Sequence, residues 1–501
     1  MALPTDGIPP QGVLRVASSG NRSHLSRLSR AGRAWQLAPR LYVEGAVLPP
    51  ESVARTHALA VIDHVWPGGA VLSDRSGLSG PVPVEGWLFL CHPDPPRRSD
   101  LVLPGLVLSP RVGPGPLPGD IPLPGGRVHQ AGVVRALVEN VSVPGRPAVS
   151  RPNRRAGTAV VEDRLDELAR TGGNGRIQTL LAELDVIRGA LPNHPAELVR
   201  ERLAELLGTR SGTLAASARL AARLSGAPYD AHCLALVQAL VTTLGRTAPR
   251  PRAALGDGWE WEPFFEAYFS NYIEGTEFGV EQARRIAVEG DIPSSRPADA
   301  HDVAATYRLA VDVQLARETP TGSSELLELL LERHAVLMSA RPEKRPGQFK
   351  ASPNYAGGHQ FVAPDLLVGT LRRGFEVLAI LTDPLHRAIA LMFLLTECHP
   401  FDDGNGRVAR LLANAELSRA GQVRLIVPTA YRNNYLAALS GTSQGAGRGE
   451  SLVAVLDFAQ RWTAAIDWSS YERARNDVEA SHGFLDPAVA ESTGRRLRLP
   501  P

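Results

Sequence analysis

One segment constrains the fold more than any other. A strongly apolar stretch, residues 385–397, leads through a short glycine-containing loop into a second helical stretch, residues 407–419. The first stretch is apolar on every side, which is typical of a helix buried in a core; its residues include Ile389, Ala390, Met392, Phe393, Leu394 and Leu395. In the second stretch, Leu411, Leu412 and Leu417 should face inward. The loop therefore lies at a helix N-terminus, where free N–H groups and the helix dipole favour an anion.

The loop itself carries side chains suited to phosphate chemistry. Gly404 and Gly406 let the backbone approach phosphate oxygens closely, and Asn405 can donate hydrogen bonds to them. Asp403 offers a hard oxygen ligand of the kind that holds Mg²⁺ bridging phosphates. These residues predict a site for a magnesium-bound nucleotide.

Three further side chains flank the loop. Arg407 and Arg410 are three residues apart on the second helix, share a face, and can bind phosphates in a forked geometry. The imidazole of His399 has an unperturbed pKa of about 6.5, which suits it to take a proton from a hydroxyl near neutral pH. We therefore expect a general base beside the nucleotide phosphates.

The string His399-Pro-Phe-Asp-Asp-Gly-Asn-Gly-Arg-Val-Ala-Arg410 resembles the active-site motif of the Fic family, H-P-F-x-D/E-G-N-G-R-x-x-R, without a departure. The resemblance extends from about Trp259 to Ser470. It implies an all-helical core with a β-hairpin flap. It also implies a protein adenylyltransferase, which transfers AMP from Mg-ATP to a Ser, Thr or Tyr hydroxyl of a target protein. His399 would then be the base, Asp403 the Mg²⁺ ligand, and residues 404–407 with Arg410 the nucleotide-binding residues.

Two neighbouring segments extend the resemblance. Residues 345–361 look like the flap that docks the target by strand addition, although the family's usual aromatic-then-Arg reads Phe349-Lys350 and its usual Pro-Pro reads Ala363-Pro364. Phe349, Lys350 and Phe361 are accordingly expected to dock the target. Tyr431-Arg-Asn-Asn-Tyr435 is similar to the segment that lines the adenine pocket, with plain helix packing of Tyr435 as the alternative.

A third segment suggests regulation. Ser270-Asn-Tyr-Ile-Glu274-Gly275 matches the family's inhibitory S/T-x-x-x-E-G/N helix. The resemblance implies that Glu274 pairs with Arg410 and so removes the guanidinium that should hold the γ-phosphate. The alternative is an ordinary surface glutamate at a helix end.

The N-terminal part differs in charge from the rest. Residues 1–155 hold 17 arginines, no lysine and 10 acidic residues, a net of +7, whereas the whole chain carries only +2. A helix over 22–30, within a predicted helix-turn-helix at 13–43, presents Arg22, Arg27 and Arg30, which could hold DNA phosphates. A solvated arginine-rich face is the alternative. Residues 1–245 also resemble the winged-helix regulators of abortive-infection (AbiE-type) systems, through this helix and the segments 36–43 and 135–140.

The predicted fold class is mainly α, with an all-helical Fic core and β-hairpin flap preceded by a winged-helix and mixed α/β region. The expected divisions are a winged-helix domain at 1–48, a β-rich mixed region at 49–157, a helical region at 158–246, a linker at 247–258, the Fic domain at 259–470 and a C-terminal tail at 471–501.

The remaining expectations concern compartment and partners. Cys91, Cys233 and Cys398 are too scattered for a disulfide framework. No signal peptide is visible, and the apolar stretch 233–244 is too short to span a bilayer, so we expect a cytoplasmic protein without membrane contact. Fic domains often dimerise, which leaves a homodimer open. Two rival functions also stay open: AMP removal with Glu274 positioning a water, and a DNA-binding regulator whose Fic domain senses nucleotide.

Overall fold

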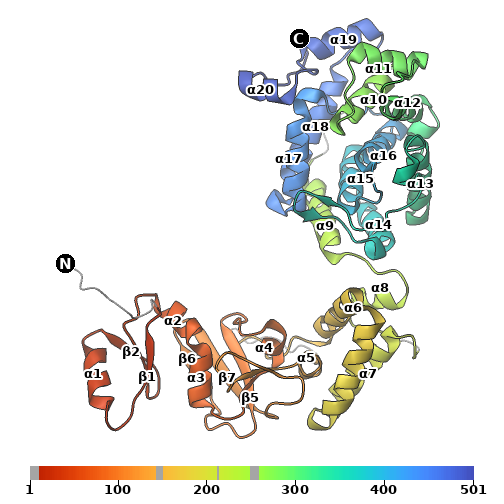
Figure 1. The fold of residues 1–501 in the computed structure, drawn as a ribbon. Coiled ribbons are helices and arrows are strands. Elements are labelled where there is room, and N and C mark those ends of the chain that lie inside the picture. The colour runs from red at the N-terminus through yellow and green to blue at the C-terminus, as the bar shows by residue number, and fades with distance from the viewer. Residues whose placement is uncertain (1–10, 143–150, 211–213, 249–258, 501) are drawn as a thin grey trace. The chain divides into compact units, whose positions relative to one another are not determined.

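The structure of this chain is a computed structural model that describes residues 11–142, 151–210, 214–248 and 259–500 (Figure 1). The chain divides into two compact units, Met1–Ser225 and Gly226–Pro501. Helices dominate the second unit and sheets are concentrated in the first, as the predicted fold class requires. Each unit is described by itself.

The first unit begins with a small three-stranded antiparallel sheet in the order β1-β3-β2. Its elements are β1 (Val13–Val16), α1 (Arg22–Arg30), β2 (Ala34–Ala38) and β3 (Leu41–Glu44). Helix α1 has the predicted bounds and buries Leu25 and Leu28 against the sheet. The helix-turn-helix predicted at 13–43 is wrong, because α1 is the one helix of that range and Val13–Val16 forms a strand that pairs with β3.

A six-stranded mixed sheet follows, in the order β6-β7-β5-β4-β9-β8. The pairs β5–β7 and β4–β9 are parallel, and the other neighbours are antiparallel. The strands are β4 (Val71–Leu72), β5 (Trp87–His92), β6 (Leu101–Leu103), β7 (Leu106–Val112), β8 (Ile121–Pro122) and β9 (His129–Gln130). The helices of this region are α2 (Pro50–Thr56), α3 (Ala58–Val65), α4 (Asp74–Ser79) and α5 (Val133–Asn140). The predicted β-rich mixed character is therefore present.

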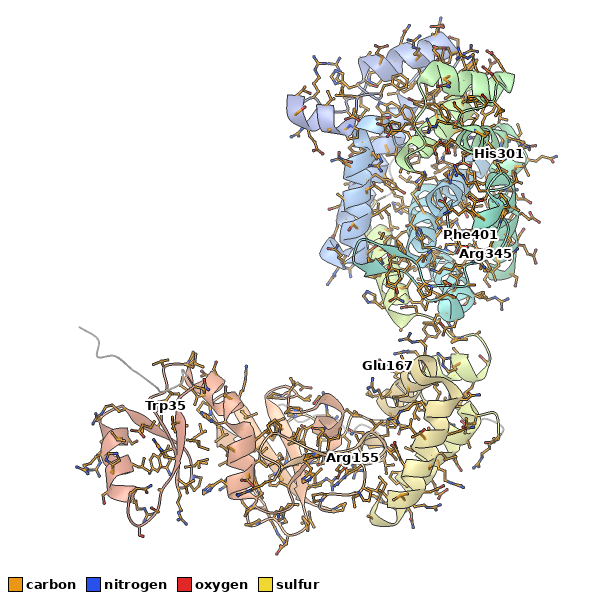
Figure 2. The ribbon with its side chains drawn as sticks, in the orientation of Figure 1. Trp35, Arg155, Glu167, His301, Arg345 and Phe401 are labelled. Atoms are coloured by element: carbon orange, nitrogen blue, oxygen red, sulfur yellow. The ribbon has the colours of Figure 1, made fainter. Side chains whose placement is uncertain are left out.

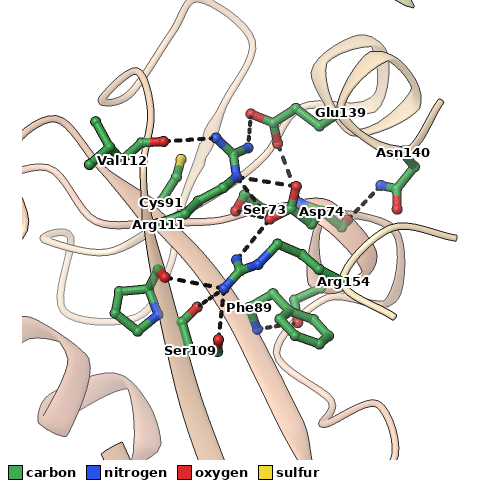
Figure 3. A network of polar contacts seen from close by, with 12 residues as sticks. Ser73, Asp74, Phe89, Cys91, Ser109, Arg111, Val112, Glu139, Asn140 and Arg154 are labelled. Carbon is green, nitrogen blue, oxygen red and sulfur yellow. Dashed lines mark hydrogen bonds and ion pairs between the residues drawn. The ribbon is translucent and has the colours of Figure 1, made fainter. Parts of the chain in front are cut away.

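A network of polar contacts around the buried carboxylates of Asp74 and Glu139 joins this sheet to its helices (Figure 3). The Asp74 carboxylate accepts hydrogen bonds from Arg111 Nε and Arg154 Nη1, both at 2.9 Å. Glu139 on α5 pairs with Arg111 at 2.9 Å, and Arg154 also donates to the Ser109 hydroxyl on β7 at 2.7 Å. Because each charge in this network meets an opposite charge, it can be buried without an unpaired ion.

Helices complete the first unit. They are α6 (Thr158–Ile187), α7 (Asn193–Leu206) and α8 (Ala218–Leu224). The apolar faces of α6 and α7 pack together with α5 in a separate small core, and α8 contacts α6.

The boundary between the units differs from the prediction. Helix α9 (Ala231–Arg246) was expected to belong with residues 158–246, but Cys233, Val237 and Leu240 are buried in the core of the second unit. The division accordingly falls at residue 225, because the apolar face of α9 packs on the helices of that core. Most of the predicted linker, residues 249–258, lies outside the described residues.

The second unit is a helical bundle built around two central helices, α15 (Pro384–Cys398) and α16 (Asn405–Arg419). Around them lie α10 (Glu262–Ile273), α11 (Val280–Arg284), α12 (Pro297–Val311), α13 (Ser323–Leu337), α14 (Pro364–Leu378), α17 (Arg432–Ser443) and α18 (Glu450–Ala464). A hairpin of β10 (Tyr355–Ala356) and β11 (His359–Gln360) precedes α14. The apolar stretch from the sequence is buried almost throughout α15, as predicted.

The C-terminal segment is more ordered than the predicted tail at 471–501. It contains α19 (Tyr471–Ala480) and α20 (Pro487–Thr493). Tyr471, Ala474 and Val478 are buried in an aromatic core with Trp462. Helix α19 is therefore part of the bundle, because its apolar side completes that core.

The described residues contain three cysteines and several long helices that bear on disulfide bonding and on membrane crossing. Cys91, Cys233 and Cys398 are all buried free thiols. Within the described ranges, no helix combines the length and the apolar character that crossing a bilayer requires.

Candidate functional site: the loop between α15 and α16

The glycine-containing loop joins the C-terminus of α15 to the N-terminus of α16. His399 caps α15 in the left-handed region at φ 47°, and Gly404 caps α16 at φ 75°. Gly404 is also tightly enclosed, since a Cβ there would lie 3.0 Å from Met338 Sδ. Helix α16 begins at Asn405, so the N–H groups of Asn405 and Gly406 belong to its first turn and have no carbonyl partner within the helix. The predicted anion-binding helix start is therefore formed, two residues earlier than expected.

His399 is held in one orientation. Its Nδ1 lies 3.3 Å from the carbonyl oxygen of Thr396, and its ring stacks on Phe361 at 3.9 Å with an interplanar angle of 8°. Because a carbonyl can only accept, this contact places the proton on Nδ1 and leaves Nε2 as the acceptor. Burial lowers the pKa of His399 to about 4, so the imidazole is neutral near pH 7.

Asp403 presents a carboxylate at the mouth of the loop. Its side chain is 38% exposed, and Oδ1 accepts the Gly404 N–H at 2.7 Å. The other oxygen stays available, which fits a cation that is held by one carboxylate plus phosphate oxygens and water. The part of the chain described here holds no cluster of three or more His, Cys, Asp or Glu side chains that could enclose a metal.

The predicted inhibitory pair is formed. Arg410 Nη2 donates to Glu274 Oε1 at 2.7 Å and to the Ser270 carbonyl at 2.9 Å, while its Nε donates to the Ser270 hydroxyl at 2.9 Å. Burial opposes the charge of Arg410, but the Glu274 carboxylate more than compensates and holds the pKa of the guanidinium above its usual value. Glu274 reaches over the first turn of α16, because a Cβ on Gly406 would clash with Oε1. Gly275, with φ 86°, ends the α10 segment that carries Glu274.

Arg407 pairs with other side chains of the protein but stays close to the loop, since its Nη2 lies 3.7 Å from Asp403 Oδ1. Its guanidinium is buried and pairs with Asp302 of α12 at 2.9 Å, with Asn271 of α10 at 3.4 Å. Its Nε has no hydrogen-bond partner. Arg407 therefore joins α16 to α12 and α10, and only Arg410 of the two predicted phosphate-binding arginines lies beside the Glu274 carboxylate.

The three residues expected to dock a target from the flap do not share one place. Phe361 covers His399, but Phe349 stacks on Phe401 at 5.6 Å, and Lys350 is buried beneath the loop with 3% exposure. Figure 2 labels Phe401 and Arg345 in this part of the second unit, where Arg345 pairs with Asp402 at 2.8 Å. Phe349 is half-buried and Lys350 is buried against the loop, and their docking of a target stays a prediction.

Tyr435 is also fully buried. Its hydroxyl lies 3.3 Å from Met392 Sδ, inside the same core as α15. It also shares a side-chain hydrogen bond with Arg410, so it packs beside the Glu274–Arg410 pair, and its adenine contact stays a prediction.

Two residues that contact the loop, His334 and Asn354, were not predicted from the sequence. His334 on α13 stacks on Phe401 at 3.7 Å and contacts the Asp403 carbonyl at 3.2 Å, while Asn354 donates to the carbonyls of His399 and Phe401. Neither sits in a motif of its own, and their importance depends on contacts between segments distant along the chain.

The side chains and backbone groups around the loop indicate which kind of ligand it can bind. A helix N-terminus, an available carboxylate, a buried arginine and a neutral histidine surround one loop, and such an arrangement can bind phosphate groups with a proton acceptor beside them. Residues 325–417 match the sequence model of the Fic/DOC family, so the chain contains a Fic domain.

Curated relatives agree with this assignment. The chain is 31% identical over 195 residues to "Protein adenylyltransferase Fic" of Drosophila erecta, covering 36% of this chain and 38% of the relative. It is 27% identical over 190 residues to "Protein adenylyltransferase fic-1" of Caenorhabditis elegans, covering 36% and 37%. The match thus spans little more than a third of each relative.

Solved structures that resemble the chain include C. elegans Fic-1 (aa134–508), at 20% identity and a TM-score of 0.35, covering 60% of this chain and 85% of that one. A Fic domain containing signaling protein from Bacteroides thetaiotaomicron matches at 21% identity and a TM-score of 0.35, covering 46% and 91%.

Proposed function

We propose that this chain is a protein adenylyltransferase that transfers AMP from ATP to a Ser, Thr or Tyr hydroxyl of a target protein. The observation that carries the proposal is the neutral, oriented His399 beside the free N–H groups at the start of α16. The adenylyltransferase names of the relatives support the same reaction.

In the proposed reaction, Nε2 of His399 takes the proton of the target hydroxyl. The hydroxyl oxygen then bonds to the α-phosphorus of ATP, and the bond from that phosphorus to the bridging oxygen breaks. Pyrophosphate leaves, and AMP stays on the target. The N–H groups of Asn405 and Gly406 lie in the first turn of α16, which supports a role in binding phosphate oxygens.

Asp403 is the residue that would hold Mg²⁺, which neutralises phosphate charge when it is bound. The partial exposure of its carboxylate supports this role.

Regulation follows from the pair at 2.7 Å between Glu274 and Arg410. While the carboxylate occupies the guanidinium, Arg410 cannot bind the γ-phosphate, and the negative charge of Glu274 repels that phosphate. We propose that ATP then binds in a pose that cannot be attacked in line.

The experiment is self-labelling with α-labelled ATP and Mg²⁺, comparing Glu274→Gly with Glu274→Gly/His399→Ala. Loss of label in the double variant is expected. Equal labelling of the two would sink the proposal, and release of AMP from a modified target before any labelling would favour the rival function of AMP removal.

We also propose a DNA-binding role for the first unit. Arg22, Arg27 and Arg30 are exposed on α1, on the side opposite Leu25 and Leu28. A salt-dependent gel shift with DNA from the chain's own promoter, lost when the three arginines are replaced by glutamine, is the expected result. An unchanged shift in that variant would exclude α1. The winged-helix assignment, the cytoplasmic location and a homodimer stay predictions.

A further inference from the structure

Lys350 belongs to the predicted flap segment, where an exposed side chain is expected, yet its side chain is buried. It is one of only two lysines in the chain, Lys344 being the other. Its ammonium is buried, where it donates to the carbonyl of Cys398 at 3.0 Å and to Oδ1 of Asn354 at 2.7 Å. Its own N–H donates to the Pro400 carbonyl at 2.8 Å. Burying a cation is costly unless its hydrogen bonds are satisfied, so this side chain is held firmly in place.

Asn354 extends the same set of contacts. Its Nδ2 donates to the carbonyl of His399 at 3.2 Å and to that of Phe401 at 3.0 Å. Every backbone carbonyl over residues 398–401 therefore accepts a hydrogen bond from Lys350 or Asn354.

These contacts determine where the imidazole of His399 points. His399 is in the left-handed region, which a non-glycine residue occupies at an energetic cost and only when its surroundings enforce it. The backbone carbonyls of Cys398, His399 and Pro400 each accept a hydrogen bond from Lys350 or Asn354. The φ and ψ of His399, and with them the direction of its ring, thus depend on this pair.

We propose that Lys350, acting through Asn354 and the carbonyls of residues 398–401, is a positioning residue for His399. This inference rests on the proposed AMP transfer. Lys350 touches neither the nucleotide-binding first turn of α16 nor Asp403. Its loss should therefore misplace the base while leaving ATP binding in place.

The test uses the full chain in the Glu274→Gly background, with three further variants: Lys350→Met, Lys350→Arg and Lys344→Met. Methionine keeps the unbranched shape of lysine without a donor, arginine restores donors, and Lys344 is the matched control. Two quantities are measured for each variant: the rate constant of self-labelling as a function of ATP concentration, and the hydrogen exchange of the peptide that covers residues 398–404.

We expect Lys350→Met to lower the saturating rate by about 100-fold, as misplacing a reacting group by about 1 Å can do, with the half-saturating ATP concentration unchanged. Exchange should rise in the 398–404 peptide alone. Lys350→Arg should recover most of the rate, and Lys344→Met should match its parent.

The contrary outcomes are distinct. A normal rate per folded molecule in Lys350→Met, or an exchange increase spread over the whole second unit, would overturn the positioning role. If the Glu274→Gly parent transfers no label, the proposed function fails, and a local exchange increase in Lys350→Met would still establish that Lys350 positions the loop. Unchanged exchange would overturn that as well.

Discussion

Replacing Glu274 by glycine should convert the Fic domain from a restrained to an active state. The carboxylate contacts Arg410 at 2.7 Å, and the guanidinium is buried. At an effective dielectric constant of about 20, two unit charges about 4 Å apart attract by about 4 kcal/mol. The Glu274 side chain is 28% exposed, so solvent screens part of this attraction. We expect about half, or about 2 kcal/mol, to oppose ATP in its reactive pose, which corresponds to about 30-fold in rate.

The assay is the initial rate of self-labelling with α-labelled ATP at saturating Mg²⁺. Glu274→Gln separates charge from shape, because the amide can still accept from Arg410 but carries no charge, so its rate should fall between those of the parent and the glycine variant. Glu277→Gln removes an exposed glutamate three residues further on and should change nothing. If Glu274→Gly labels no faster than the parent while binding ATP equally well, the electrostatic reasoning is refuted.

Four further outcomes follow from the same structure. In the Glu274→Gly background, Gly406→Ala should weaken ATP binding measured by calorimetry, because its Cβ would occupy space at the first turn of α16 and lie 2.9 Å from Arg410 Nη1; binding at the affinity of that background would contradict this. Arg407→Met should lower the free energy of unfolding in urea by about 3 kcal/mol, since it leaves buried Asp302 with one ion-pair partner fewer; a loss below about 1 kcal/mol would mean that the pair is unimportant. Burial lowers the pKa of His399 to about 4, so the acid limb of the labelling rate should lie near pH 4 rather than near pH 6.5. Burial likewise lowers the pKa of His334 to about 4. The unfolded chain takes up this proton below about pH 6.5 and the folded chain does not, so the contribution of His334 alone should lower the unfolding free energy by up to about 3 kcal/mol between pH 6.5 and pH 4, read as the difference in pH dependence between the parent and His334→Gln.

The central helices could be predicted from the sequence because they depend on a local pattern. An apolar stretch, a glycine-containing loop and a following helix place His399 and Gly404 without knowledge of distant contacts. Glu274 and Arg410 are 136 residues apart, and only the resemblance to a family brought them together in advance.

The positions of Lys350 and Tyr435 could not be predicted in the same way. The Lys350 ammonium meets the carbonyl of a residue 48 positions further on, and burial of that kind is decided by packing between segments. Lysine side chains are usually exposed, so the sequence alone predicts an exposed ammonium at position 350. Only the packing of the loop 398–401 against it shows that the ammonium is buried.

Packing also explains the misplaced boundary and the missing helix-turn-helix. The apolar face of α9 identifies a helix but not the core that it joins. The four residues of β1 form a strand because β3, some thirty residues later, supplies the hydrogen bonds.

Two samples of ATP test the central claim most directly, one labelled at the α-phosphorus and one at the γ-phosphorus. Each is incubated with the Glu274→Gly chain and Mg²⁺, and the protein is then separated and counted. AMP transfer predicts that the α label stays on the protein and the γ label leaves in pyrophosphate. Retention of the γ label, or of neither, would contradict the proposed function.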